Sequence, residues 1–340
     1  MQRRRFVQTL AAVAASVSFA PVGGVAVAAE TADRYANLKR GRYLGELKSL
    51  VTVDGPKVFT EGPCCDRAGN VYFTNAGPSQ ILKWDGAKLS VFREPANGAN
   101  GLLFDRQGRL VACEGTAGRV TRTDMASPKI EVLADSFNGH PLGLPNDLTF
   151  DAAGRIYFTS RLPNADPAKG NVNAVYRIDV DGSLHQVLHL PNIHMPNGIV
   201  LSPDDKTLYL VESHSDLDRN RCILAFDLAA DGTTSKPRKF IDFYPGRSGD
   251  GMAIDAEGNL YIAAGLHKTR KTSETLDTRP GIHVVSPAGE LLEFLETPED
   301  TLTNCRFGGE DLKTLYITCG RQLLSVRTTI AGKSMYRPEK

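Results

Sequence analysis

The sequence predicts an all-β fold, a six-bladed β-propeller with four-stranded antiparallel blades around a central channel. One unit occurs six times: an acidic or amide residue, a short apolar strand, an Asp-x-x-Gly-like turn and a second strand. Successive units begin 39, 46, 51, 53 and 54 residues apart, and a β-rich repeat of this length is typical of propeller blades. Helix signals are scarce, because Pro287 and Gly289 interrupt the amphipathic stretch 284–295.

The turns and the outer strands support this interpretation. The turns carry Asp at the first position and Gly where a positive φ is required; the four clearest begin at Asp66, Asp105, Asp151 and Asp255. Between units, segments 80–84 and 174–178 alternate apolar and polar residues, as half-buried strands do. Because propellers close their ring by pairing the two ends of the chain, we expect residues 42–59 to complete the blade that begins at Asn304.

The N-terminus predicts export. Arg3, Arg4 and Arg5 precede a moderately apolar run from Thr9 to Val25, and Ala26-Val27-Ala28 is a small-residue cleavage site. The arginines favour the twin-arginine export machinery as a partner. We therefore expect residues 1–28 to be a signal peptide, 29–39 a linker, 40–330 the propeller and 331–340 a C-terminal tail. The mature protein is expected in the periplasm or secreted, as a monomer.

Charge and cysteine content exclude other classes. The net charge of +1 becomes about −2 once the three N-terminal arginines are removed, so no basic field indicates nucleic acid. After residue 30 no window has the roughly 20 apolar residues of a membrane span. The six cysteines include no C-x-x-C pair, which argues against a zinc thiolate site, and we interpret most of them as small core residues.

The first residues of the six units form the candidate site. All carry short oxygen-bearing side chains: Glu61, Asn100, Asn146, Asn197, Asp250 and Asn304. In isolation, Asn-Gly or Asp-Gly indicates only a turn. Six in register predict a shared polar channel, and two carboxylates with amide oxygens suit a hard cation such as Ca²⁺.

The chain resembles the senescence-marker-protein/gluconolactonase family of six-bladed propellers over roughly residues 45–330. The motifs that carry the resemblance are Thr60-Glu61-Gly-Pro63, Pro145-Asn146-Asp147-Leu148, Met195-Pro-Asn197-Gly198, Gly249-Asp250-Gly251-Met252 and Thr303-Asn304-Cys-Arg-Phe-Gly-Gly309. The resemblance implies one divalent metal, Ca²⁺ ahead of Zn²⁺, Mn²⁺ or Mg²⁺, bound by Glu61, Asn146, Asn197 and Asp250. It places Asn100 and Asn304 on the floor or wall of a substrate pocket.

The chemistry that the resemblance implies is metal-assisted hydrolysis of a small sugar or hydroxy-acid lactone. The metal would polarise the ester carbonyl, and Asp250 would act as general base or as nucleophile, two roles that the sequence leaves open. His140 and His194 precede channel residues and are candidate substrate-binding residues. Strand alternation predicts that Asp147 points away from the metal. The family's sugar lactonases often carry a basic residue just before the position of Asn146, where this chain has Leu142-Gly-Leu144-Pro.

Two alternatives stay open. The same site could hydrolyse phosphotriesters or aryl esters, or the chain could be a non-catalytic binding propeller with a structural metal, because propellers host many functions.

Overall fold

The computed structural model describes residues 33–127, 129–162, 164–170 and 173–334. The expected signal peptide, residues 1–28, lies outside these ranges. The chain divides into residues 1–36 and residues 37–340, and the fold below is that of the second unit. No helix among the described residues has the length and apolar character needed to cross a membrane.

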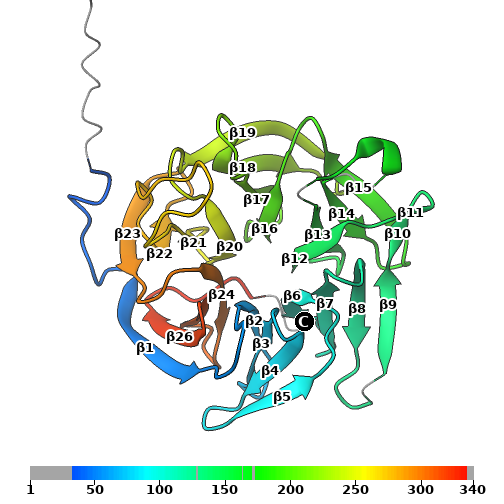
Figure 1. The fold of residues 1–340 in the computed structure, drawn as a ribbon, viewed down its shortest axis with the longest axis horizontal. Helices are drawn as coiled ribbons and strands as arrows, with labels where there is room; N and C mark the ends of the chain where they lie inside the picture. Colours follow the sequence, from blue (N-terminus) through cyan, green and yellow to red (C-terminus); the bar gives the residue numbers. More distant parts are fainter. Residues whose placement is uncertain (1–32, 128, 163, 171–172, 335–340) are drawn as a thin grey trace, which may run out of the picture. The chain divides into compact units, whose positions relative to one another are not determined.

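The strands confirm the predicted propeller. They form six four-stranded antiparallel sheets, which Figure 1 shows arranged as a ring. The innermost strands are β2 (Thr60–Cys65), β6 (Ala99–Phe104), β12 (Leu144–Phe150), β16 (Pro196–Leu201), β20 (Gly249–Ile254) and β24 (Leu302–Gly308). The second strands are β3 (Val71–Asn75), β7 (Leu110–Glu114), β13 (Ile156–Arg161), β17 (Thr207–Ser213), β21 (Leu260–Ala264) and β25 (Thr314–Cys319).

The outer half of each blade adds two more strands. The third strands are β4 (Gln80–Trp84), β8 (Arg119–Thr123), β14 (Ala174–Ile178), β18 (Arg221–Leu228), β22 (Gly281–Val285) and β26 (Gln322–Thr328). The fourth strands of blades 1 to 5 are β5 (Leu89–Arg93), β9 (Ile130–Ala134), β15 (Leu184–His189), β19 (Thr234–Asp242) and β23 (Leu291–Glu296). Outside the blades lie a small hairpin, β10 (Ser136–Phe137) with β11 (His140–Pro141), and the 3-10 helix η1 (Pro167–Lys169).

The ring closes between the two ends of the chain, as predicted. Strand β1 (Leu44–Thr52) pairs with β26 and supplies the fourth strand of blade 6. The chain is fixed where it enters β1, because Glu293 accepts hydrogen bonds from the backbone N–H groups of Gly41, Arg42 and Tyr43. In the closed ring β1 is the outer edge strand of blade 6, and β24 is the inner one.

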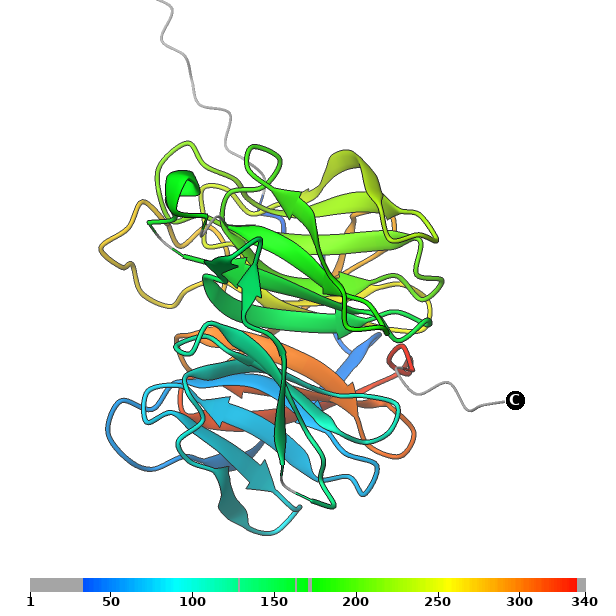
Figure 2. The same ribbon diagram turned by 90° about the vertical axis from the view of Figure 1, so that its right-hand side faces the viewer.

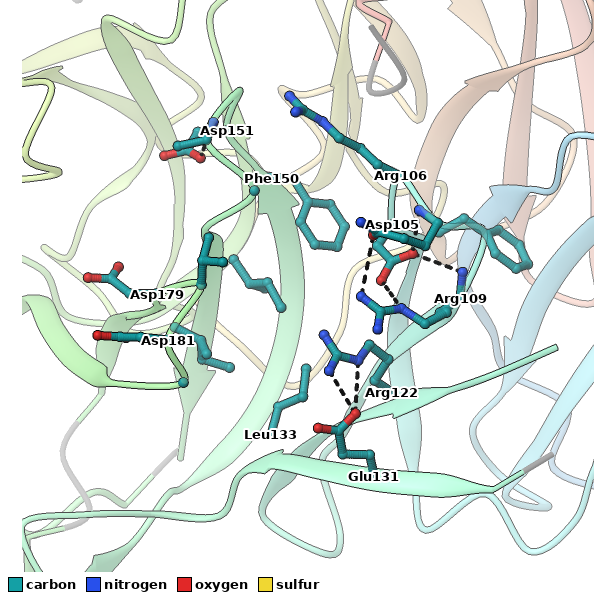
Figure 3. A pocket seen from close by; sticks show the side chains of 18 of the residues that line it. Asp105, Arg106, Arg109, Arg122, Glu131, Leu133, Phe150, Asp151, Asp179 and Asp181 are labelled. Atoms are coloured by element: carbon teal, nitrogen blue, oxygen red, sulfur yellow. Dashed lines mark hydrogen bonds and ion pairs between the residues drawn. The ribbon is translucent and has the colours of Figure 1, made fainter. Parts of the chain in front are cut away.

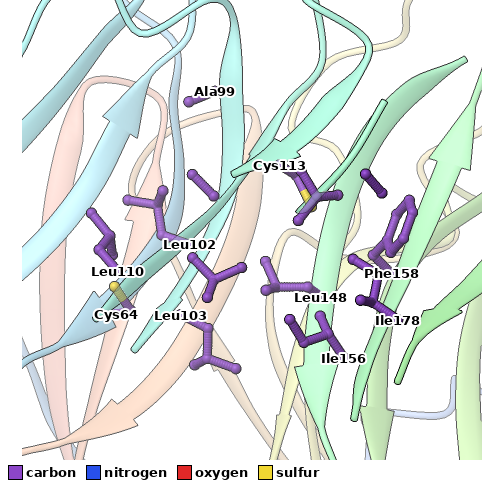
Figure 4. Packing of buried hydrophobic residues seen from close by; sticks show 14 of the residues in the cluster. Cys64, Ala99, Leu102, Leu103, Leu110, Cys113, Leu148, Ile156, Phe158 and Ile178 are labelled. Atoms are coloured by element: carbon purple, nitrogen blue, oxygen red, sulfur yellow. The ribbon is translucent and has the colours of Figure 1, made fainter. Parts of the chain in front are cut away.

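Apolar side chains fill the space between neighbouring blades. Figure 4 shows this packing for blades 1 to 3, where Cys64, Leu102, Leu110, Leu148 and Phe158 belong to one buried cluster. None of the six cysteines, all of which lie in the described part, forms a disulfide. Five of them are buried, which agrees with the expectation that they are core residues.

The two faces of the ring differ. Figure 2 shows η1 on one face and the last described C-terminal residues on the opposite face. On that opposite face the backbone of Ala331 accepts a hydrogen bond from Ala256, and Gly332 donates one to Leu312. The six candidate residues lie at the other end of the inner strands, close to the start of each.

Candidate functional site

Every inner strand contains a register irregularity at the candidate positions. In blades 2 to 5 the regular pairing with the second strand breaks over two residues, and the candidate residue is the first of them. In blade 1 the break follows Glu61, and in blade 6 it precedes Asn304. A β-bulge redirects side chains that strict alternation would place on opposite faces of the sheet. A bulge therefore recurs at or next to the candidate position in every blade.

The glycines after the candidate residues allow the inner strands to approach one another. A Cβ on Gly198 would lie 2.5 Å from the backbone oxygen of Asp250 in the next blade, and one on Gly62 would lie 2.1 Å from that of Asn100. A Cβ on Gly251 would overlap the Asn304 side chain. Gly198 and Gly251 do not have a positive φ. The Asn-Gly and Asp-Gly pairs at these two positions thus serve close packing around the ring, and not a turn.

The Asp250 carboxylate is held by two neighbouring side chains, those of Asn197 and Arg247. Its Oδ1 accepts a hydrogen bond of 2.6 Å from Asn197 Nδ2, and its Oδ2 lies 2.5 Å from Nη2 of Arg247. Asn197 Nδ2 also donates to Ser213 Oγ at 3.3 Å. These contacts hold the carboxylate in place and turn the Asn197 amide so that its Oδ1 stays available as an acceptor.

Glu61 is buried, and its surroundings disfavour its negatively charged form. Burial is the main cause that raises its pKa well above the ordinary value, and the negative charges of Asp250 and Asp147 raise it further. The hydrogen bond from the Gly62 N–H and the charge of Arg247 act in the opposite direction. A cation between Glu61 and Asp250 would relieve this repulsion.

Two amide oxygens at the site lack partners. The buried Oδ1 atoms of Asn100 and Asn146 accept no hydrogen bond within the described residues. A buried acceptor without a partner is costly and calls for an explanation. The Asn146 oxygen, with those of Glu61, Asn197 and Asp250, would make an all-oxygen donor set of the kind that Ca²⁺ prefers. Among the described residues, no group of three or more His, Cys, Asp or Glu side chains is arranged to hold a metal ion, so amide oxygens would have to supply part of any metal site here.

The chain is similar to several known proteins. Residues 59–321 match the family described as SMP-30/Gluconolactonase/LRE-like region. The chain belongs to this family. It is 30% identical over 303 residues to a gluconolactonase of Zymomonas mobilis, covering 81% of this chain and 80% of that protein. It is 24% identical to human regucalcin over 265 residues, covering 77% and 83% of the two chains.

Solved structures show the same fold. A gluconolactonase from Xanthomonas campestris superposes with a TM-score of 0.69 at 27% identity, over 83% of this chain and 89% of that one. A calcium-binding regucalcin from Agrobacterium tumefaciens superposes with a TM-score of 0.65 at 18% identity, over 86% and 96% of the two chains. The gluconolactonase relatives support a lactonase-type function for this chain, and the regucalcin structure adds support for the fold.

Asp147 does not point away from the site, contrary to the expectation from strand alternation. It lies within the bulge of β12, and its Oδ1 is 3.3 Å from Nη2 of Arg306 on the opposite blade. Burial raises the pKa of Asp147, while Arg306, the Leu148 N–H and the Asn304 side chain oppose this rise. The pair spans the axis, and Asn304 is bound to it.

The two candidate histidines lie in different surroundings. The His194 backbone N–H donates to the buried carboxylate of Glu212, and its Nδ1 is 3.9 Å from Glu212 Oε2, beyond hydrogen-bond distance. Glu212 also accepts the N–H of Met195, so it fixes the segment that leads to Asn197. His140 is exposed on β11, and no interaction within the described residues joins it to the site carboxylates.

Sequence reasoning missed Arg247, Arg161 and Glu212. The charges of Asp250, Glu61, Arg247 and Glu212 all act on Arg161, and burial is the main cause that lowers its pKa. Burial likewise raises the pKa of Glu212 to about 7. Arg161 and Glu212 lie at the ends of second strands, outside the repeated pattern. Arg247 could have been noticed, because it stands three residues before Asp250.

A separate cavity of about 430 Å³ lies between blades 2 and 3 (Figure 3). None of the six candidate residues lines it. Two of its three arginines are paired with acids, since Arg109 Nε lies 2.7 Å from Asp105 Oδ2 and Arg122 Nη2 lies 2.7 Å from Glu131 Oε2. The third, Arg106, donates to the backbone oxygen of Ala152. This cavity is therefore not the site predicted from the repeats.

Proposed function

We propose that the protein is a metal-dependent lactonase that hydrolyses a small sugar or hydroxy-acid lactone, with Ca²⁺ as its metal. The observation that carries the proposal is the donor set at the axis: two buried carboxylates, Glu61 and Asp250, beside two unpartnered amide oxygens. Asn146 and Asn197 would complete the metal site. The gluconolactonase relatives supply the reaction class.

Each residue of the site would have its own role in the reaction. When bound, a divalent cation would act as a Lewis acid on the ester carbonyl. Asp250 would take a proton from the attacking water, since its carboxylate is held at a fixed orientation by Asn197 and Arg247. Glu61 would hold the cation and balance its charge. Asn100, whose Oδ1 is unpartnered, would contact the substrate or the water.

We also propose that the protein is exported and acts as a monomer. The twin-arginine segment would direct the folded chain to the periplasm or the medium, and all six cysteines are reduced in the fold, which suits folding in a reducing cytosol. A monomer suffices for the reaction, because all the proposed ligands come from one chain.

The first test is a pH-indicator assay of residues 29–340 with γ- and δ-lactones. We expect chelation to abolish turnover, Ca²⁺ to restore it, and Asp250→Asn to lower kcat by about 1000-fold, the scale of losing a positioned base. Asp204→Asn, at an exposed turn on the opposite face, is the matched control. Metal-independent turnover, or an unaffected Asp250→Asn variant, would contradict the proposal. Calcium stabilisation without any turnover would favour a binding propeller.

A further inference from the structure

Arg161 is a cation near the axis that the proposed reaction does not use. It is the last residue of β13 and pairs in register with Leu144, two residues before Asn146. Its side chain is only partly exposed. No hydrogen bond or ion pair joins its guanidinium to another group in the part of the chain that the structure describes. A largely buried guanidinium without an anion is costly.

The electrostatic neighbours of Arg161 place it at the candidate site. Arg161 belongs to blade 3, whereas the carboxylates that attract it come from Glu61 of blade 1, Glu212 of blade 4 and Asp250 of blade 5. Arg247 of blade 5 repels it. These charges come from three other blades, so the guanidinium of Arg161 lies within electrostatic range of Glu61 and Asp250. Its strand register sets Arg161 beside Leu144, at the end of blade 3 where the candidate residue Asn146 lies.

The nearby carboxylates already have other roles. Asp250 is paired with Arg247, which also donates to the backbone oxygen of Leu302. Glu212 holds the backbone N–H groups of His194 and Met195. With a divalent cation bound, Glu61, Asp250 and Glu212 would supply three negative charges against four positive ones, two on the cation and one each on Arg247 and Arg161. One positive charge is then left without a counter-charge.

We propose that Arg161 binds a carboxylate on the substrate, so that the protein prefers lactones that carry an anionic carboxylate over neutral lactones. A planar guanidinium matches a carboxylate in a two-point hydrogen bond. A carboxylate brings a single negative charge, the amount that Arg161 lacks. This inference rests on the proposed function, because it names the substrate class of the same site.

The kinetic test compares two lactones that differ only in the group concerned. The γ-lactone of glucaric acid has a free carboxylate where the γ-lactone of gluconic acid has a hydroxymethyl group. We expect Arg161→Met to lower kcat/KM for the glucaric lactone by about 10- to 100-fold, the scale of one charge-assisted pair, and to leave the gluconic lactone within about threefold. Arg161→Lys should recover part of the loss. Arg238→Met, in an exposed outer-strand pair, is the control.

A binding test separates this inference from the proposed hydrolysis. Tetrahydrofuran carboxylate resembles a lactone ring with a carboxylate but contains no ester, and tetrahydrofurfuryl alcohol is its neutral counterpart. We expect the carboxylate alone to raise the Tm of the calcium-loaded protein, and Arg161→Met to remove the shift. If no lactone is hydrolysed but this shift is seen, the proposed reaction fails and the carboxylate site stands. Equal effects of Arg161→Met on both lactones, or a shift independent of Arg161, would overturn the inference.

Discussion

Asp147 and Arg306 are buried charges that meet from opposite blades. Asp147 is 1% exposed and Arg306 is 7% exposed. Each also has a buried atom that finds no partner among the described residues, Oδ2 of Asp147 and Nε of Arg306. The pair is therefore incompletely satisfied, and its two members depend on each other. Removing one charge would leave the other buried without compensation.

We expect Arg306→Met to lower the free energy of unfolding by about 3–5 kcal/mol, the usual cost of an unpaired buried charge. Arg306 opposes the rise in the Asp147 pKa, so its loss raises that pKa further. A carboxyl group with a raised pKa in the folded state destabilises the fold as pH increases. The loss measured by urea denaturation should therefore be larger at pH 8 than at pH 5.

The double variant Asp147→Asn/Arg306→Met gives the matched comparison, because it removes both charges. It should recover a large part of the loss and show little change with pH. Arg238→Met, which breaks an exposed pair with Asp227, should cost no more than about 1 kcal/mol. An Arg306→Met loss of that small size would show that the axis pair is solvated.

At the scale of the element, the bulged inner strand is the repeated unit of the site. Its glycine brings one inner strand against the next, and a Cβ on Gly198 would meet the backbone oxygen of Asp250 at 2.5 Å. Because the contact would be with backbone atoms, neither strand can move aside as a flexible side chain could. A methyl group there would push blade 4 away from blade 5 and shift a proposed ligand.

We expect Gly198→Ala to destabilise the protein by about 2–3 kcal/mol, as overpacking of a filled interior does. It should also weaken calcium binding more than its stability loss explains, since it displaces Asp250. Gly45→Ala is the control, because its Cβ would meet Arg327 O at 3.3 Å, a contact that a small shift relieves. Equal stability for the two variants, measured by urea denaturation, would refute the close-packing role of Gly198.

The sequence predicted the elements better than the directions of side chains within them. The repeated hairpins indicated six blades, and the segment before Glu61 was correctly assigned to the last blade. In β12 the residue after Asn146 is Asp147, and not the glycine that indicates a bulge in four of the other blades, so strict alternation gave the wrong direction for Asp147. Arg161 and Glu212 were missed because their contacts with the site depend on neighbouring blades. Only the packed ring brings such residues together.

At the scale of the whole molecule, the proposed metal ligands connect four of the six blades. Glu61 belongs to blade 1, Asn146 to blade 3, Asn197 to blade 4 and Asp250 to blade 5. A cation held by all four would add a link between blades that also meet through apolar packing, the β1–β26 closure and polar contacts such as the Asn197–Asp250 hydrogen bond. Ligand binding to the folded state alone raises its stability by mass action.

We expect Ca²⁺ to raise the Tm of the chelator-treated protein, and to raise it more at pH 8 than at pH 5.5. The pKa of Glu61 is raised, chiefly by burial. In the metal-free folded state Glu61 therefore stays protonated up to a higher pH than an ordinary glutamate. Calcium must displace that proton, which makes binding weaker at low pH. In the metal-free protein the same group favours the fold at low pH and loses this contribution as the pH rises through its folded-state pKa.

Glu61→Gln tests this assignment, because the amide keeps the shape of the side chain and removes its charge. The variant should lose most of the calcium-induced Tm shift together with its pH dependence, and it should be less sensitive to alkaline pH than the metal-free wild-type protein. Glu257→Gln, at the β20–β21 turn on the opposite face, should behave like the wild type. A calcium shift that persists unchanged in Glu61→Gln would place the cation elsewhere and remove the reason for the four-blade ligand set.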